Sequence, residues 1–113
     1  MKKIIDYLAA LFIFILGSAH TVLTPLFYKT FDLDALWFAG TGLAFVFLGF
    51  TNIARIRTTE LIITLLCLFG NVLALIFCVC IVIKLAEPQA YISLFVLLFL
   101  FSLSLIDVKI KKI

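Results

Sequence analysis

The fold is decided by residues 61–83, which read LIITLLCLFGNVLALIFCVCIVI and contain no charged side chain. A helix needs about 20 apolar residues to cross the hydrocarbon core of a bilayer. A spanning segment must also satisfy its own backbone hydrogen bonds in lipid, which a single helix does and a lone strand does not. Residues 61–83 are therefore predicted to form a transmembrane helix.

Three further apolar segments of similar character lie at 4–23, 33–53 and 90–107. Lys2-Lys3 and Gly17-Ser18-Ala19 give the first of them some likeness to a signal peptide, but we expect it to be retained as a helix. The sequence thus predicts four transmembrane helices in a single domain, residues 1–113.

Proline or charge marks the breaks between the segments, at Thr24-Pro25, Arg55-Ile56-Arg57 and Glu87-Pro88. Asp32 or Asp34 is predicted to cap the second helix, and Thr58 or Thr59 the third. Because the linkers are short, successive helices are expected to be antiparallel neighbours. The predicted fold is an all-α, four-transmembrane-helix, up-down bundle.

Composition supports a membrane protein and excludes several other classes. Of the 113 residues, 66% are hydrophobic and 13% are charged. A soluble domain is closer to half apolar and a quarter charged, and a chain this short cannot bury the excess. The net charge of +3 forms no dense basic patch, so nucleic-acid binding is not expected.

The distribution of Lys and Arg predicts the orientation of the helices. Seven lie at the chain ends and in the second loop: Lys2, Lys3, Arg55, Arg57, Lys109, Lys111 and Lys112. Only Lys29 and Lys84 lie in the other two loops. Positive loops stay in the cytoplasm, so both termini are predicted to be cytoplasmic, with the cell inner (plasma) membrane as the location.

Small and polar residues recur at helical spacing and predict which faces pack together. The clearest stripe is Thr64, Cys67, Asn71, Ala74 and Cys78. The other helices carry Asp6, Ala10, Ile13, Gly17, His20 and Thr24, then Ala35, Ala39, Gly42, Val46 and Gly49, and finally Ser93, Ser102 and Ser104. We expect these stripes to meet in the bundle interior, with Leu, Ile and Phe facing lipid.

Asn71 lies about 15 Å into its helix at 1.5 Å per residue, near the middle of the bilayer. A buried amide needs a partner. Two interpretations remain open: an interhelical hydrogen bond that fixes the register of the helices, or a contact to a ligand or ion.

One layer in the outer third of the bundle gathers reactive side chains. By helix rise, His20 lies at a height similar to that of Thr41, Cys78 and Ser93, with Trp37 just above. This layer is the predicted candidate site for a ligand or ion, and the ordinary alternative is an interfacial histidine satisfied by a loop carbonyl or water.

The remaining reactive residues predict structural roles. Arg55 and Arg57 are expected to mark the inner boundary and to extend to lipid phosphates, with specific headgroup binding as the alternative. Cys67, Cys78 and Cys80 are interpreted as packing residues. No catalytic residue, metal site or cofactor is predicted, because one histidine without a neighbouring ligand pattern is a weak signal.

Three hypotheses about function follow. The first is a non-enzymatic membrane protein that binds membrane lipid, a small amphipathic molecule, another membrane subunit or a second copy of itself. The second is a small transporter or channel with His20 and Asn71 lining the path. The third is an enzyme acting at the outer leaflet around His20, Cys78 and Asp32, which lacks a paired acid and base.

Overall fold

The computed structural model describes residues 1–112, and within them every regular element is helical. The elements are α1 (Lys2–Val22), α2 (Thr24–Phe27), α3 (Leu33–Arg57), α4 (Leu61–Lys84) and α5 (Pro88–Lys112). The four long helices are each long and apolar enough to cross a membrane. Each of them overlaps one of the four predicted segments, and most are longer than predicted by one to five residues at an end.

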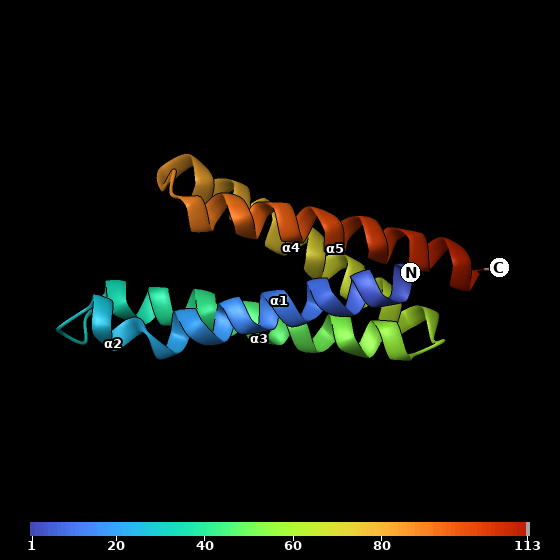
Figure 1. Cartoon of the computed structure of the whole chain (residues 1–113), viewed down its shortest axis with the longest axis horizontal. Helices are drawn as coiled ribbons and strands as arrows, with labels where there is room; N and C mark the ends of the chain where they lie inside the picture. The colour runs from blue at the N-terminus through green and yellow to red at the C-terminus, as the bar shows by residue number, and fades with distance from the viewer. Residues whose placement is uncertain (113) are drawn as a thin grey trace.

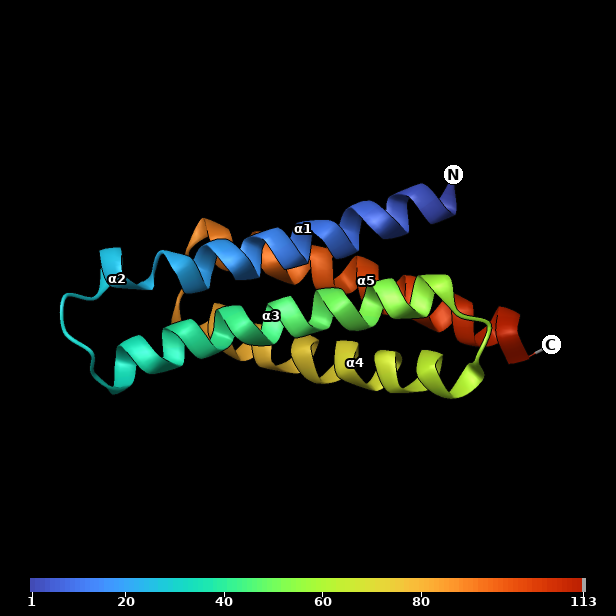
Figure 2. The same cartoon turned by 90° about the horizontal axis from the view of Figure 1, so that it is seen from below.

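The long helices lie lengthwise in a body with principal extents of 51 × 23 × 23 Å. Both termini and the α3–α4 connection lie at one end, which we call the termini end (Figures 1 and 2). The opposite end, which carries α2 and the α4–α5 connection, is the distal end. In Figure 1 the α1–α3 pair and the α4–α5 pair are close at the termini end and diverge toward the distal end.

Glycine explains the close packing of α1 against α3. A Cβ added to Gly17 would lie 2.5 Å from the carbonyl oxygen of Gly42 and 2.7 Å from the Cβ of Phe45. Thr21 Oγ1 donates a hydrogen bond to the carbonyl of Ala39 at 3.1 Å across the same interface. Small residues let helix backbones approach in this way and so increase dispersion contacts and interhelical hydrogen bonding.

The predicted stripes are largely confirmed as the buried faces. On α4, Thr64, Cys67, Asn71 and Cys78 are all buried. The apolar core between the helices consists of Ala10, Ile13, Phe45, Leu48, Cys78, Leu97 and Leu100. Ser102 was wrongly assigned to the interior: its side chain is exposed and donates to the carbonyl of Leu98 within its own helix.

Large apolar side chains cover the outside of the bundle. Leu8, Leu66 and Phe95 are between 60% and 64% exposed on three different helices. Apolar exposure of this extent on every long helix is what a lipid environment permits.

The helix boundaries confirm one predicted cap and correct another. Asp32 caps α3, since its carboxylate accepts the N–H of Ala35 at 2.9 Å. The residue that precedes α4 is Glu60, with no side-chain cap, and Thr58 Oγ1 instead accepts the N–H of Glu60 at 3.1 Å. After α1 ends at Val22, Pro25 lies in the first turn of the short helix α2, which is absent from the predicted helices.

Candidate functional site

A buried arginine links three helices at the termini end. Arg55 lies in the last turns of α3 and is 0% exposed. Its Nη1 donates to Asp6 Oδ2 of α1 at 2.7 Å, and its Nη2 donates to Asp6 Oδ1 at 2.5 Å. Its Nη1 also donates to Asp107 Oδ2 of α5 at 2.5 Å. The planar guanidinium suits this fork-shaped binding, which a lysine ammonium could not reproduce.

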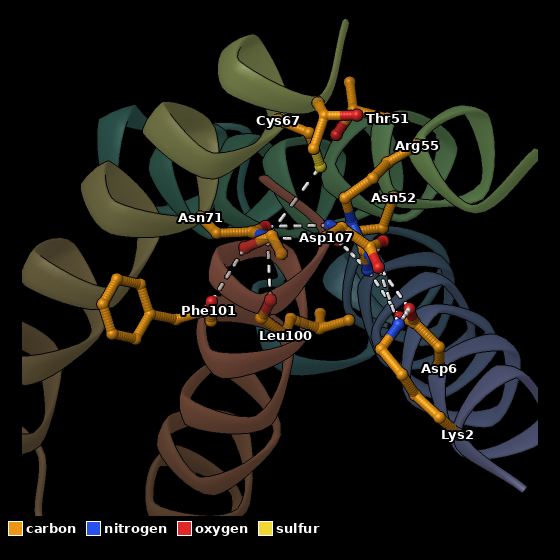
Figure 3. A network of polar contacts seen from close by, with 12 residues as sticks. Lys2, Asp6, Thr51, Asn52, Arg55, Cys67, Asn71, Leu100, Phe101 and Asp107 are labelled. Atoms are coloured by element: carbon orange, nitrogen blue, oxygen red, sulfur yellow. Dashed lines mark hydrogen bonds and ion pairs between the residues drawn. The ribbon is translucent and has the colours of Figure 1, made fainter. Parts of the chain in front are cut away.

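Lys2 completes the charge balance of this cluster. Its Nζ lies 2.7 Å from Asp107 Oδ1 and 3.6 Å from Asp6 Oδ2. Two cations therefore face two carboxylates (Figure 3). Burying a charge without a partner costs roughly several kcal/mol. Here each of the four charged groups is paired with an opposite charge, which offsets that cost. We call Lys2, Asp6, Arg55 and Asp107 the charge cluster.

The position of Arg55 corrects a prediction. The sequence predicts that Arg55 lies in a charged turn and extends to lipid phosphates. In the structure α3 continues to Arg57, so Arg55 falls one turn after Asn52 on the buried face of the helix. Arg57, two positions further around the helix, is exposed.

Two asparagines continue the cluster toward the middle of the bundle. Arg55 Nη2 donates to Asn52 Oδ1 at 3.0 Å. Asn52 and Asn71 are paired by two hydrogen bonds, at 2.8 and 3.1 Å. Asn71 Nδ2 also lies 3.2 Å from the carbonyl oxygen of Leu100 and 3.1 Å from Ser104 Oγ, both on α5. The interhelical hydrogen bond that was one of the two interpretations of Asn71 is therefore present.

Lys111 ties the end of α3 to α4 and α5. Its Nζ donates to the carbonyl of Arg55 at 2.7 Å and to Thr64 Oγ1 at 2.9 Å. A cation at the C-terminal end of a helix satisfies a carbonyl that has no partner within the helix. Within the described chain, every buried side-chain nitrogen and oxygen has a hydrogen-bond partner.

The predicted outer layer is held by local contacts. His20 stacks on Phe38, with ring centroids 3.7 Å apart and an angle of 21° between the ring planes. Phe38 also contacts Phe27 and Tyr28, at centroid distances of 5.8 and 5.3 Å. His20 thus belongs to an aromatic cluster that joins α1, α2 and α3 at the distal end.

The other residues of that layer bond to nearby backbone carbonyls. Thr41 donates to the carbonyl of Trp37 at 3.0 Å. Ser93 donates to Gln89 at 2.8 Å, and the Cys78 thiol lies 3.7 Å from the carbonyl oxygen of Ala90. Among residues 1–112, no hydrogen bond joins two of the predicted site side chains His20, Trp37, Thr41, Asn71, Cys78 and Ser93.

An apolar groove runs along the outer face between α1 and α5, and we call it the α1–α5 groove. It has a volume of about 270 Å³ and is lined by Ile5, Leu8, Ala9, Phe12, Phe95, Val96 and Phe99. Ala9 and Val96 pack against the core and form its floor. The exposed rings of Phe95 and Phe99 form one wall, where they pack edge to face at a centroid distance of 5.1 Å.

Comparison of the chain with protein-family models, curated proteins and solved structures gave no match. The described residues contain no cluster of three or more His, Cys, Asp or Glu side chains arranged to hold a metal ion. The features that could carry a function include a closed polar network, the aromatic cluster around His20 and an apolar groove.

Sequence reasoning missed most of the charge cluster, although a signal was present. Asp6, Arg55 and Asp107 each lie within or beside an apolar segment, where a charge needs a partner. Phe45, Leu48, Asn52 and Arg55 follow one another at spacings of three, four and three residues, the pattern of a single helix face. Continuing the second helix past residue 53 would have placed Arg55 inside the bundle.

Proposed function

We propose that this chain is a non-enzymatic integral membrane protein that binds a lipid-like, amphipathic molecule by its hydrocarbon chain. The observation that carries the proposal is the α1–α5 groove. It is concave, its lining is wholly apolar, and it lies between two helices long enough to cross a membrane. Apolar concave surfaces with few polar groups are typical of sites for small apolar ligands.

The lining of the groove favours a flexible chain as its occupant. The small side chain of Ala9 lies at the bottom of the groove. Phe12 and Phe99 flank it on opposite sides and are 45% and 44% exposed. An acyl chain in the groove would contact α1 and α5 at once, whereas on a convex helix surface it would contact one helix. The gain in dispersion contacts is small for each atom pair and adds up along the chain.

The charge cluster supports this proposal because it holds the two helices that line the groove in fixed relative positions. Asp6 on α1 and Asp107 on α5 are both held by Arg55, which sets the spacing of the two groove helices at the termini end. The groove is therefore a preformed surface, and preformed sites lose less free energy on binding because less must be ordered.

The orientation belongs to the same proposal: both termini in the cytoplasm, in the cell inner (plasma) membrane. Its support is the seven Lys and Arg residues at the termini end against two, Lys29 and Lys84, in the loops of the distal end. The bias follows the positive-inside rule. Single cysteines at Thr30 and at Lys112, each in a background without the three native cysteines, test it. An impermeant thiol reagent applied to intact cells should label the Thr30→Cys protein alone.

Transport and catalysis are supported less well by the contacts of the side chains they would use. Asn71 is engaged with Asn52, Leu100 and Ser104, so a path along it would have to break these bonds. Asp32 caps α3, and Cys78 is buried against Ala90. Flux in liposomes that His20→Ala abolishes with the fold intact would favour transport over the proposed function.

Native mass spectrometry of the detergent-purified chain with monoolein tests lipid binding in the groove. Monoolein carries one acyl chain and no charge, so it reports on the groove alone. We expect one retained monoolein, with binding at least about tenfold weaker in Ala9→Phe, which fills the floor. Ala19→Phe, on an exposed position of the same helix, is the matched control and should bind as the wild type does.

Two results would overturn the groove proposal. One is equal monoolein binding by Ala9→Phe and the wild type, with both folded by circular dichroism. The other is a dimer mass that Ala9→Phe abolishes, because a second copy of the chain would then cover the groove. Ala9→Leu provides a milder substitution if the phenylalanine variant fails to fold.

A further inference from the structure

A second, polar pocket opens at the termini end, where α1 begins and α3 passes into α4. It has a volume of about 330 Å³ and is lined by Lys3, Tyr7, Ile56, Arg57, Thr58 and Thr59. It shares no lining residue with the α1–α5 groove. We call it the basic pocket.

The two cations of the basic pocket are free to bind a ligand. Lys2, Arg55 and Lys111 at the same end are engaged with Asp6, Asp107 and backbone or hydroxyl oxygens. Lys3 and Arg57 are exposed, and within residues 1–112 their side chains form no ion pair or hydrogen bond. Asp6 and Glu60 are the nearest carboxylates along the chain to Lys3 and Arg57 respectively, and neither is part of the pocket lining.

We propose that the basic pocket binds a phosphate group, and that its source is the headgroup of an anionic membrane lipid. Arg57 offers a fork of N–H donors, Lys3 a point charge, and Tyr7 and Thr59 hydroxyl donors. Phosphate oxygens are the acceptors that an arginine fork and a lysine ammonium fit best. These donors come from α1, from α3 and from the loop that follows α3.

The position of the pocket selects a lipid over a soluble phosphate. α3 has 25 residues and is about 37 Å long at 1.5 Å per residue. The hydrocarbon core is about 30 Å thick, so the last turn of α3 extends into the headgroup layer. Ile56 and the ring of Tyr7 place apolar surface beside the cations, where the glycerol and upper acyl region of a bound lipid would lie.

The test measures binding of dioctanoyl phosphatidylglycerol to the full chain in detergent by native mass spectrometry. The binding variant is Lys3→Gln/Arg57→Gln. The control is Lys109→Gln/Lys112→Gln, which removes the same charge from exposed positions of α5. We expect one tightly held phosphatidylglycerol, with at least about tenfold weaker binding in the first variant and unchanged binding in the second. Dioctanoyl phosphatidylcholine, which is zwitterionic, should bind more weakly to the wild type.

Each other outcome would overturn part of the proposal. An equal loss of phosphatidylglycerol binding in both double variants would mean that net charge alone attracts the lipid. It would overturn the basic pocket as the binding site. Inorganic phosphate that binds the lipid-free protein as tightly, and is lost in Lys3→Gln/Arg57→Gln, would overturn the lipid source. Thr59→Val, which removes one hydroxyl and no charge, should weaken phosphatidylglycerol binding severalfold, and no effect of it would contradict the assigned geometry. Monoolein binding should be unchanged in all of these variants, so failure here is separate from failure of the groove proposal.

Discussion

Arg55 and Asp6 lie 49 residues apart in the sequence and form a two-bond ion pair inside the bundle, at 2.5 and 2.7 Å. Arg55 is 0% exposed and Asp6 is 1% exposed. Because the same guanidinium also holds Asp107, one side chain fixes the relative positions of α1, α3 and α5 (Figure 3). Arg55 is therefore the side chain that joins three helices at the termini end.

Replacing Arg55 by methionine should destabilise the protein by about 3–5 kcal/mol, because Asp6 and Asp107 would stay buried with only Lys2 to pair them. The measurement is the free energy of unfolding in mixed detergent micelles, followed by circular dichroism. Arg57→Met, an exposed arginine of the same helix, should change it by less than about 0.5 kcal/mol. Equal effects of the two variants would contradict the assigned role of the cluster.

Removing the whole buried triad should be less harmful than removing its centre. In Asp6→Leu/Arg55→Met/Asp107→Leu no buried charge is left without a partner, and apolar replacements of similar volume are often neutral or stabilising. We expect the triple variant to unfold at a higher fraction of denaturing detergent in the mixed micelles than Arg55→Met alone. A triple variant that is less stable than Arg55→Met would show that the ion pairs add net stability.

Asn71→Leu should cost about 1–3 kcal/mol, because two buried hydrogen bonds to Asn52 would be lost, while Asn52 keeps its bonds to the Leu48 carbonyl and Arg55. The same unfolding assay measures the change. Ser102→Ala is the control, since that hydroxyl is exposed and bonds only within its own helix, and it should have little effect. An Asn71→Leu variant as stable as the wild type would mean that the bonds of Asn52 to the Leu48 carbonyl and Arg55 are sufficient without Asn71.

Two glycines of α3 that are two residues apart should respond in opposite ways to alanine. A Cβ at Gly42 would lie 2.6 Å from the carbonyl oxygen of Gly17, so Gly42→Ala should push α1 away and cost about 1–3 kcal/mol. A Cβ at Gly40 would meet no atom within 4 Å. Gly40→Ala should therefore stabilise the helix, by about 0.5–1 kcal/mol. The measurement is the thermal unfolding of both variants and the wild type under the same conditions. Stability changes of the same sign would contradict the prediction.

Much of the fold could be predicted from local pattern. The length and apolar character of the segments predict four long helices, and the stripe Thr64, Cys67, Asn71 and Cys78 predicts the buried face of α4. These features depend on residues within a few turns of one another, for which helical periodicity is a sufficient guide. The cap at Asp32 is predictable for the same reason.

The candidate sites were less accessible to sequence reasoning. The proposed groove and the basic pocket each combine residues from two or more segments of the chain, and neither carries a motif. The layer predicted around His20 rested on height along each helix alone. Height does not say which way a side chain points, and in the structure the polar groups of that layer bond to nearby backbone carbonyls or stack on Phe38.

Local sequence patterns account for the four long helices, for their apolar, membrane-spanning length and for most of their inward faces. The tertiary structure was needed to show which charges meet. Lys2, Asp6, Arg55 and Asp107 come from three helices, and each alone looks like an ordinary boundary residue. Their pairing depends on the register between helices, which close packing at Gly17 and Gly42 and the Asn52–Asn71 bonds set together. A buried charge is tolerated when it is paired, and both carboxylates that pair with Arg55 come from other helices, so local sequence alone did not reveal this cluster.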